Sequence, residues 1–149
     1  MEITYYEDIE LHKKSILGEY YVDKEEMMEF AKKWDAKPFH VDEELAKSYP
    51  NGGLFAPLTY TLSVISQLSS ISDRYLVAHI AALELERVQV LTPVRPGDQL
   101  VITEEYTEKR ESRTHPDRGL IRIRCEVKNQ NDEICLRASS LVMVAKRPA

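Results

Sequence analysis

The sequence predicts an α+β protein in which an antiparallel β-sheet curls around one central α-helix. Two observations predict this class. The segment from Ser48 to Ser72 contains no charged residue, although charged residues make up 30% of the chain. The second half, residues 76 to 145, consists mainly of segments rich in Val, Ile, Leu and Thr, whereas the clearest helical patterns come earlier. One helix that avoids charge, followed by a run of strands, favours a sheet that wraps around that helix.

A strand and an amphipathic helix are predicted near the N-terminus. Residues 15 to 22 (SILGEYYV) are rich in aromatic and β-branched residues, which is typical of a strand. Asp23 and Glu26 then have the spacing of a capping box, with Asp23 as the N-cap. Helical spacing of the apolar residues predicts an amphipathic helix over residues 24 to 34. Those apolar residues are Met27, Phe30, Ala31 and Trp34.

The amphipathic helix is expected to end near Asp35. Pro38 disfavours helical backbone angles at the residue before it, so the chain should turn between Asp35 and His40. A second short helix is predicted over residues 43 to 48, with Asp42 as its cap.

The uncharged segment predicts a central helix from about residue 57 to residue 70. Pro57 suits the first turn of a helix, where a missing N–H costs nothing. Prolines and glycines interrupt the segment before this point, which argues against a transmembrane span. A helix that is uncharged on every side is typical of one enclosed by protein.

Four strands are predicted after the central helix. The third shows the clearest alternation, with apolar residues from Ile121 to Val127 separated by charged ones, as in an antiparallel sheet with one wet face. Residues 129 to 132 (NQND) supply a hairpin turn. A change of apolar phase near Arg87 predicts a β-bulge. The four expected strands are residues 76–91, 99–112, 120–128 and 134–145.

Composition excludes several function classes. A net charge of −5 over 149 residues gives no footprint for nucleic acid. The first residues lack the pattern of a signal peptide, so we expect a cytoplasmic protein that is not bound to a membrane. The two cysteines, Cys125 and Cys135, lack metal spacing and are expected to be reduced, buried thiols.

Two motifs resemble a known family. Residues 30 to 56, FAKKWDAKPFHVDEELAKSYPNGGLFA, resemble the hydratase motif of the MaoC-like dehydratases, the (R)-specific enoyl-CoA hydratase group. Residues 85 to 100, LERVQVLTPVRPGDQL, are similar to the family's second signature, a strand followed by Pro-Val-x-Pro-Gly-Asp. The resemblance implies a single domain over residues 1–149 with the hot-dog fold, a long antiparallel sheet wrapped around one helix. It also implies a homodimer or higher oligomer with sites near the subunit interface.

The resemblance implies that Asp35 and His40 are the catalytic pair of a hydratase or dehydratase. Family members add water across the double bond of an α,β-unsaturated acyl-CoA or acyl-carrier thioester, or catalyse the reverse reaction. A carboxylate and an imidazole that hold the same water can move both protons on one face of the substrate. From the residues alone, Asp35 could equally be a polar helix end, and His40 a loop histidine bonded to the backbone. Neither a metal nor a cofactor is expected, and coenzyme A enters only as part of the substrate.

Backbone amides at the start of the central helix are the expected donors to the thioester oxygen. Such amides have no partner inside the helix and lie at its positive end. The resemblance places this contact at the N–H groups of Leu58 and Thr59, with Pro57 and Tyr60 beside them. Two positions depart from the family pattern: Pro57-Leu58 replaces the usual His-Gly, and Lys37 replaces an Asn.

These departures leave two alternatives open. One is a non-catalytic subunit that binds or stabilises an acyl thioester within a hetero-oligomeric dehydratase, and the other is a hot-dog acyl-CoA thioesterase. Several further residues have two interpretations each. Arg110, Arg113 and Arg118 could meet coenzyme A phosphates or form a solvated loop, and Tyr49, Tyr60 and Thr61 could line an acyl pocket or only pack. Asp98 is expected to shape a turn, and His12, His79 and His115 have no expected role.

Overall fold

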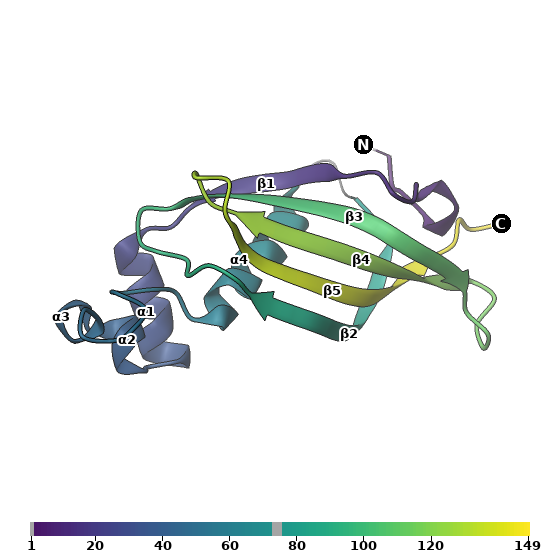
Figure 1. Ribbon diagram of the computed structural model, residues 1–149. Helices are drawn as coiled ribbons and strands as arrows, with labels where there is room; N and C mark the ends of the chain where they lie inside the picture. The colour runs from purple at the N-terminus through teal and green to yellow at the C-terminus, as the bar shows by residue number, and fades with distance from the viewer. Residues whose placement is uncertain (1, 73–75) are drawn as a thin grey trace.

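Five antiparallel strands form one sheet in the computed structural model, which describes residues 2–72 and 76–149 (Figure 1). The strand order is β1-β3-β4-β5-β2, so β2 lies at one edge of the sheet. Cys125 in the central strand β4 pairs with Glu104 of β3 on one side and Ala138 of β5 on the other. The strands are β1 (Ser15–Tyr21), β2 (His79–Val90), β3 (Gln99–Glu111), β4 (Arg118–Lys128) and β5 (Ile134–Ala145). All four predicted late strands are confirmed.

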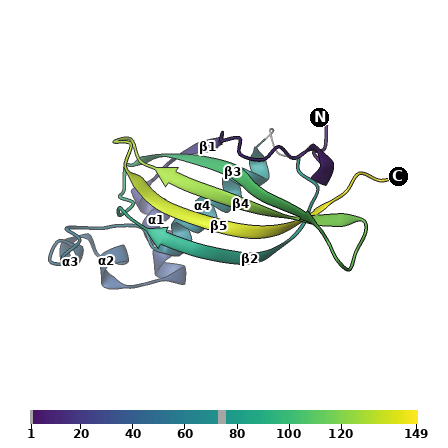
Figure 2. The same cartoon turned by 45° about the vertical axis from the view of Figure 1, so that its right-hand side comes forward.

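The sheet curls around helix α4 (Leu58–Ile71), as Figures 1 and 2 show. This is the predicted α+β, hot-dog arrangement. The three helices between residues 24 and 46 gather at one end of the sheet, near the N-terminus of α4, whereas the short helix at residues 6–8 and the β3–β4 hairpin lie at the other end. The remaining helices are η1 (Tyr6–Asp8), α1 (Lys24–Trp34), α2 (Pro38–Val41) and α3 (Glu43–Ala46).

Helix α1 has the predicted bounds and the predicted N-cap. The Asp23 side chain accepts a hydrogen bond from the Glu26 N–H at 2.9 Å. The Glu26 carboxylate, however, accepts from the hydroxyls of Tyr20 and Tyr60, and thereby ties α1 to β1 and α4. The apolar stripe is shorter than predicted: Met27 and Ala31 are fully buried, but Trp34 is 65% exposed because the helix reaches beyond the core at its last turn.

Helix α4 differs from its prediction in two respects. It begins at Leu58, with Pro57 as the N-cap rather than inside the first turn. Only one face is buried in the single chain, so the expectation of a helix enclosed on every side is wrong for this chain alone. Serines on the outer face bond to the helix itself: the Ser63 hydroxyl donates to the Thr59 carbonyl at 2.8 Å. The buried face consists of Tyr60, Thr61, Val64 and Leu68.

The predicted turns and cysteine states are also confirmed. The β2–β5 register shifts between Glu86 and Gln89, and Arg87 there has a φ of 49°, as a bulge requires. The Asn129 side chain closes the β4–β5 hairpin by accepting from the N–H of Glu133 at 3.1 Å. Both cysteines are free and buried. Within the described residues, no helix has the length and apolarity needed to cross a membrane.

Candidate active site

Asp35 and His40 come together at the end of α1. Asp35 is the C-cap of α1, and its backbone N–H donates to the Ala31 carbonyl at 2.8 Å. The chain then forms the single-turn helix α2, which begins at Pro38 and carries His40 in its last turn. Sequence reasoning expected only a turn here. His40 Nε2 lies 3.7 Å from Asp35 Oδ2, which is too long for a direct hydrogen bond.

A backbone carbonyl fixes the His40 ring. His40 Nδ1 lies 2.8 Å from the Phe55 carbonyl oxygen, which can only accept a hydrogen bond. Nδ1 therefore carries the proton in the neutral ring, and Nε2 is left as the basic nitrogen facing Asp35. The rings of Phe39 and Phe55 each lie 4.6 Å from the imidazole, and His40 is only 4% exposed. Both sequence interpretations of His40 thus hold in part, because one nitrogen bonds to backbone while the other faces the carboxylate.

Lys37 forms an ion pair with the other oxygen of Asp35, Oδ1. The Asp35 side chain is 22% exposed, between that of Lys37 at 58% and that of His40 at 5%. Lys37 stands where the family pattern has Asn. The Asp35 carboxylate therefore lies between the ammonium group of Lys37 and the imidazole of His40.

A cavity of about 230 Å³ opens beside the pair. Leu58 and Thr61 of α4 line it, together with Val90 and Leu136 from the sheet. Thr61 thus lies at this cavity, whereas the hydroxyl of Tyr60 points to Glu26, 3.1 Å away. The other residues that line it are Asp35, Lys37, Phe39, His40, Phe55, Ala56, Pro93, Val94 and Cys135.

The N-terminus of α4 points at the same region. Pro57 is fully buried and its carbonyl accepts from the Tyr60 N–H at 3.0 Å, so the amides of Leu58 and Thr59 precede the first hydrogen bond of this helix. The Leu58 side chain is 40% exposed and takes up space at the cavity that a Gly would leave free. The use of these amides as oxyanion donors stays a prediction.

Arg95, in the second motif, holds the loop that leads into α4, and sequence reasoning did not single it out. Its guanidinium donates to the carbonyls of Asn51 and Gly53, the latter at 2.9 Å. Asp98 shapes the turn below it as predicted, because its carboxylate accepts from the Arg95 N–H at 2.8 Å. The only sequence signal for this role was the position of an arginine between two turn-forming prolines. Arg95 of the second motif thus holds the loop at the end of the first motif in place.

The other candidates lie elsewhere. Arg118 pairs with its neighbour Asp117 at 2.8 Å, at the base of the β3–β4 hairpin and at the opposite end of the sheet from α2 (Figure 2). Arg110 and Arg113 are exposed in the same region, as a solvated loop would be. Tyr49 packs against Phe39 with ring centres 5.2 Å apart. Among the described residues, no histidine belongs to a group that could hold a metal ion.

Comparison with known proteins identifies the family. Residues 10–124 match the MaoC like domain. The chain belongs to the MaoC-like domain family. The uncharacterized protein YdeM of Bacillus subtilis is 29% identical over 126 residues, which cover 85% of this chain and 87% of that protein.

Solved MaoC-like structures share the architecture. A MaoC-like dehydratase from Rhodospirillum rubrum is 28% identical, with a TM-score of 0.91 over 98% of this chain and 99% of that one. The R-hydratase PhaJ1 from Pseudomonas aeruginosa has a TM-score of 0.76 over 96% of this chain and 86% of that one, at 20% identity. At that identity PhaJ1 supports the fold alone. The family is one of hydratases and dehydratases, and the matched region includes Asp35 and His40.

Proposed function

We propose that this MaoC-like protein adds water to an α,β-unsaturated acyl-CoA or acyl-carrier thioester, or removes it in the reverse reaction. The observation that supports this most is the pairing of Asp35 Oδ2 with a basic His40 Nε2, 3.7 Å apart, at the wall of a cavity. One water can contact both atoms at hydrogen-bond distance. No metal and no cofactor besides the thioester's own carrier is proposed.

In the hydration direction, His40 Nε2 takes a proton from the water as its oxygen attacks C3, and the imidazolium then gives that proton to C2 on the same face. Asp35 holds the water and faces the imidazolium that forms. The Phe55 carbonyl keeps the ring oriented throughout, because its bond uses only Nδ1. The free amides of Leu58 and Thr59 would stabilise the negative charge on the thioester oxygen.

The decisive experiment compares two Asp→Asn variants at opposite ends of α1. Enoyl-CoA absorbance is followed with short and medium acyl chains. Asp35→Asn should lower the rate by about 10²–10⁴-fold, because a positioned acid–base group contributes that much. Asp23→Asn is the matched control and should keep the wild-type rate, because Asn caps a helix as well as Asp does. A wild-type protein that binds acyl-CoA but hydrates no enoyl thioester would refute the catalytic proposal.

A second candidate is an acyl-thioester-binding subunit that works beside a catalytic partner chain. Two observations favour it: Leu58 fills part of the cavity where the family pattern has Gly, and Lys37 occupies one oxygen of Asp35. Full hydratase activity of the purified protein alone would exclude it. Thioesterase activity, in contrast, would release free thiol from saturated acyl-CoA, which a hydratase does not do.

We also propose a homodimer that forms through β2 and acts in the cytoplasm. β2 is an edge strand, and it exposes large apolar side chains to an extent that an edge strand in a monomer would not. Leu83 and Leu85 are 46% and 56% exposed. A second copy that covers β2 and the outer face of α4 would enclose the helix as the sequence predicted. Sedimentation of wild type and Leu85→Lys tests this, since the variant should dissociate.

A further inference from the structure

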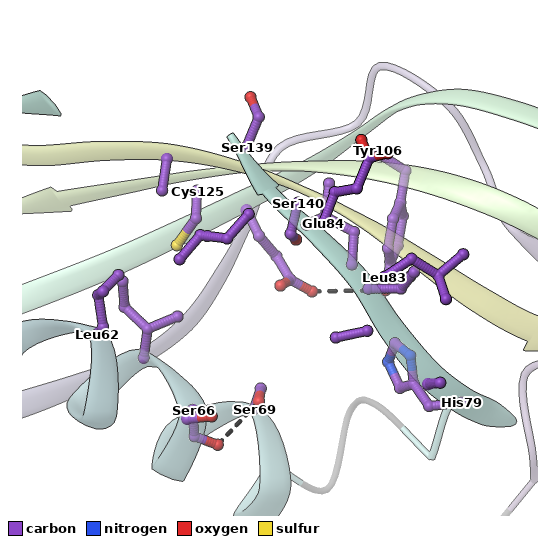
Figure 3. A pocket seen from close by; sticks show the side chains of 18 of the residues that line it. Leu62, Ser66, Ser69, His79, Leu83, Glu84, Tyr106, Cys125, Ser139 and Ser140 are labelled. Atoms are coloured by element: carbon purple, nitrogen blue, oxygen red, sulfur yellow. Dashed lines mark hydrogen bonds between the residues drawn. The ribbon is translucent and has the colours of Figure 1, made fainter. Parts of the chain in front are cut away.

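A second and larger cavity lies beside the C-terminal half of α4. Its volume is about 650 Å³. Figure 3 shows Leu62, Ser66 and Ser69 of α4 on one side, with Tyr106 and Cys125 on strands of the sheet across from them. The sequence offered no signal for this cavity.

The two cavities follow one another along α4 and β5. On α4, Leu58 lines the smaller cavity, and Leu62, one turn farther on the same face, lines the larger one. On β5, Leu136 lines the smaller cavity and Ala138 lines the larger one. From Thr61 to Ser69 an α-helix advances about 12 Å. The larger cavity therefore lies farther along α4 from Asp35 and His40 than the smaller one does.

Glu104 is the unusual residue of the larger cavity. Its side chain lines the cavity, yet the residue is only 9% exposed. Its hydrogen bond from the Tyr106 hydroxyl is long, at 3.5 Å, and no Lys or Arg is among the described residues that line the cavity. Burial raises the pKa of Glu104 to about 7, while the Tyr106 hydroxyl lowers it. Burying a carboxyl group with only a weak hydrogen bond lowers the stability of the folded protein unless another group bonds to it.

Besides Glu104 and Tyr106, the titratable residues that line the cavity are Cys125, His79 and Glu84. Cys125 is the neighbour of Glu104 in the sheet, and burial followed by the charge of Glu104 raises the pKa of that thiol to about 12. His79 and Glu84 also line the cavity, from the edge strand β2. Burial lowers the pKa of His79, so this ring is a poor cation at neutral pH. Among the described residues, the Glu104 carboxyl group thus has one long hydrogen bond, from Tyr106, and it keeps the capacity to bond a polar group of a ligand that enters the cavity.

We propose that the larger cavity receives the chain of the acyl thioester, and that Glu104 hydrogen-bonds a hydroxyl group carried on that chain. The inference rests on the proposed function, because Asp35 and His40 position the thioester end. A hydroxyl fits better than an ammonium, since burying a second charge would add a large desolvation penalty. It fits better than a plain alkyl end, which would leave the carboxyl group unsatisfied. The substrate class is thus a hydroxylated acyl thioester.

The test measures binding, separately from hydration. Saturated acyl-CoA thioesters of increasing chain length are compared by calorimetry in pairs, one member ending in methyl and the other in hydroxyl. Saturated chains cannot be hydrated, so the affinity reports recognition alone. At the length that reaches Glu104, wild type should bind the hydroxyl member about tenfold more tightly, the worth of one hydrogen bond to a charged or strongly polar group.

Two variants locate the effect. Glu104→Leu should abolish or reverse the preference, and the more conservative Glu104→Gln should reduce it. Glu105→Leu is the matched control, because adjacent strand residues point to opposite faces and Glu105 lies near His12 outside this cavity. This control should keep the wild-type preference.

Each outcome has a distinct meaning. Equal binding of both members at every length overturns the Glu104 inference and leaves the hydratase proposal standing. Hydroxyl preference without hydration of any enoyl thioester overturns the catalytic proposal and retains the binding site. If no acyl-CoA binds, both fail. If Glu104→Leu instead changes the sedimentation of the protein and neither variant alters ligand preference, a second copy fills the cavity and the inference is overturned.

Discussion

Two carboxyl groups near α4, those of Asp35 and Glu104, have opposite surroundings. Asp35 ends a helix, is partly reached by solvent, and lies between the ammonium of Lys37 and the imidazole of His40. Glu104 is in the middle of a strand, is almost completely buried, and accepts a long hydrogen bond from the phenol hydroxyl of Tyr106. The first environment suits a group that works as a charge next to a base. The second suits a group that near neutral pH exists partly as a neutral acid and recognises a hydrogen-bonding partner.

The largest expected effect on stability concerns Glu104 and pH. Its pKa is about 7 in the folded chain against an ordinary value of 4.5. Between these values the unfolded chain has released the proton while the folded chain still holds it, so rising pH lowers the free energy of unfolding. The loss amounts to about 3 kcal/mol by pH 8, and it is absent below about pH 4.

Urea unfolding of wild type and Glu104→Gln across this pH range measures the loss. The Cys125 thiol, whose pKa depends on Glu104, has a pKa of about 12 and lies outside this pH range, so the difference between the two curves isolates Glu104. The wild-type stability should fall relative to the variant as pH rises from about 4.5 to about 7 and then stay level. Parallel curves would show that the pKa of Glu104 is the same in the folded and the unfolded chain. The proposed contrast with Asp35 would then fail.

The next effect in size tests how firmly His40 is held. His40→Phe keeps an aromatic ring between Phe39 and Phe55 but removes the donor to the Phe55 carbonyl. An unsatisfied buried acceptor costs about 1–3 kcal/mol, so the free energy of unfolding should fall by that amount. Urea unfolding at neutral pH measures it. An unchanged stability would show that water reaches the carbonyl and that this bond does not orient the ring.

Part of this contrast was accessible from the sequence, and part was not. The uncharged run to Ser72 predicted α4, and the family motif predicted that Asp35 and His40 meet. Glu104 gave no signal, because in the strand it is followed by Glu105 and looks like a solvated residue until the pairing with β4 places its side chain under α4. The exposure of Trp34 was also missed, because apolar residues at helical spacing do not show at which turn of the helix the core ends.

A smaller effect, on the pKa of Glu104, is expected when the Tyr106 hydroxyl is removed. The hydrogen bond from Tyr106 lowers the pKa of Glu104, so Tyr106→Phe should raise that pKa further above 7. A carboxyl titration followed by carbon NMR measures the shift directly. The magnitude should be small, because a hydrogen bond of 3.5 Å is weak. A fall in the pKa would mean that water enters the cavity once the hydroxyl is gone.

The smallest effect on stability is expected at the other carboxyl group. Lys37→Met removes the ammonium from Asp35, but the Lys37 side chain is 58% exposed, and ion pairs of this kind contribute about 0–1 kcal/mol. The free energy of unfolding should therefore change by less than about 1 kcal/mol, at any pH where Asp35 is ionised. Thermal unfolding of wild type and variant at two salt concentrations measures it, and salt should shrink the difference further. A loss of several kcal/mol would place Asp35 among the buried charges of the protein. The two carboxyl groups would then differ in their partners but not in their exposure to water.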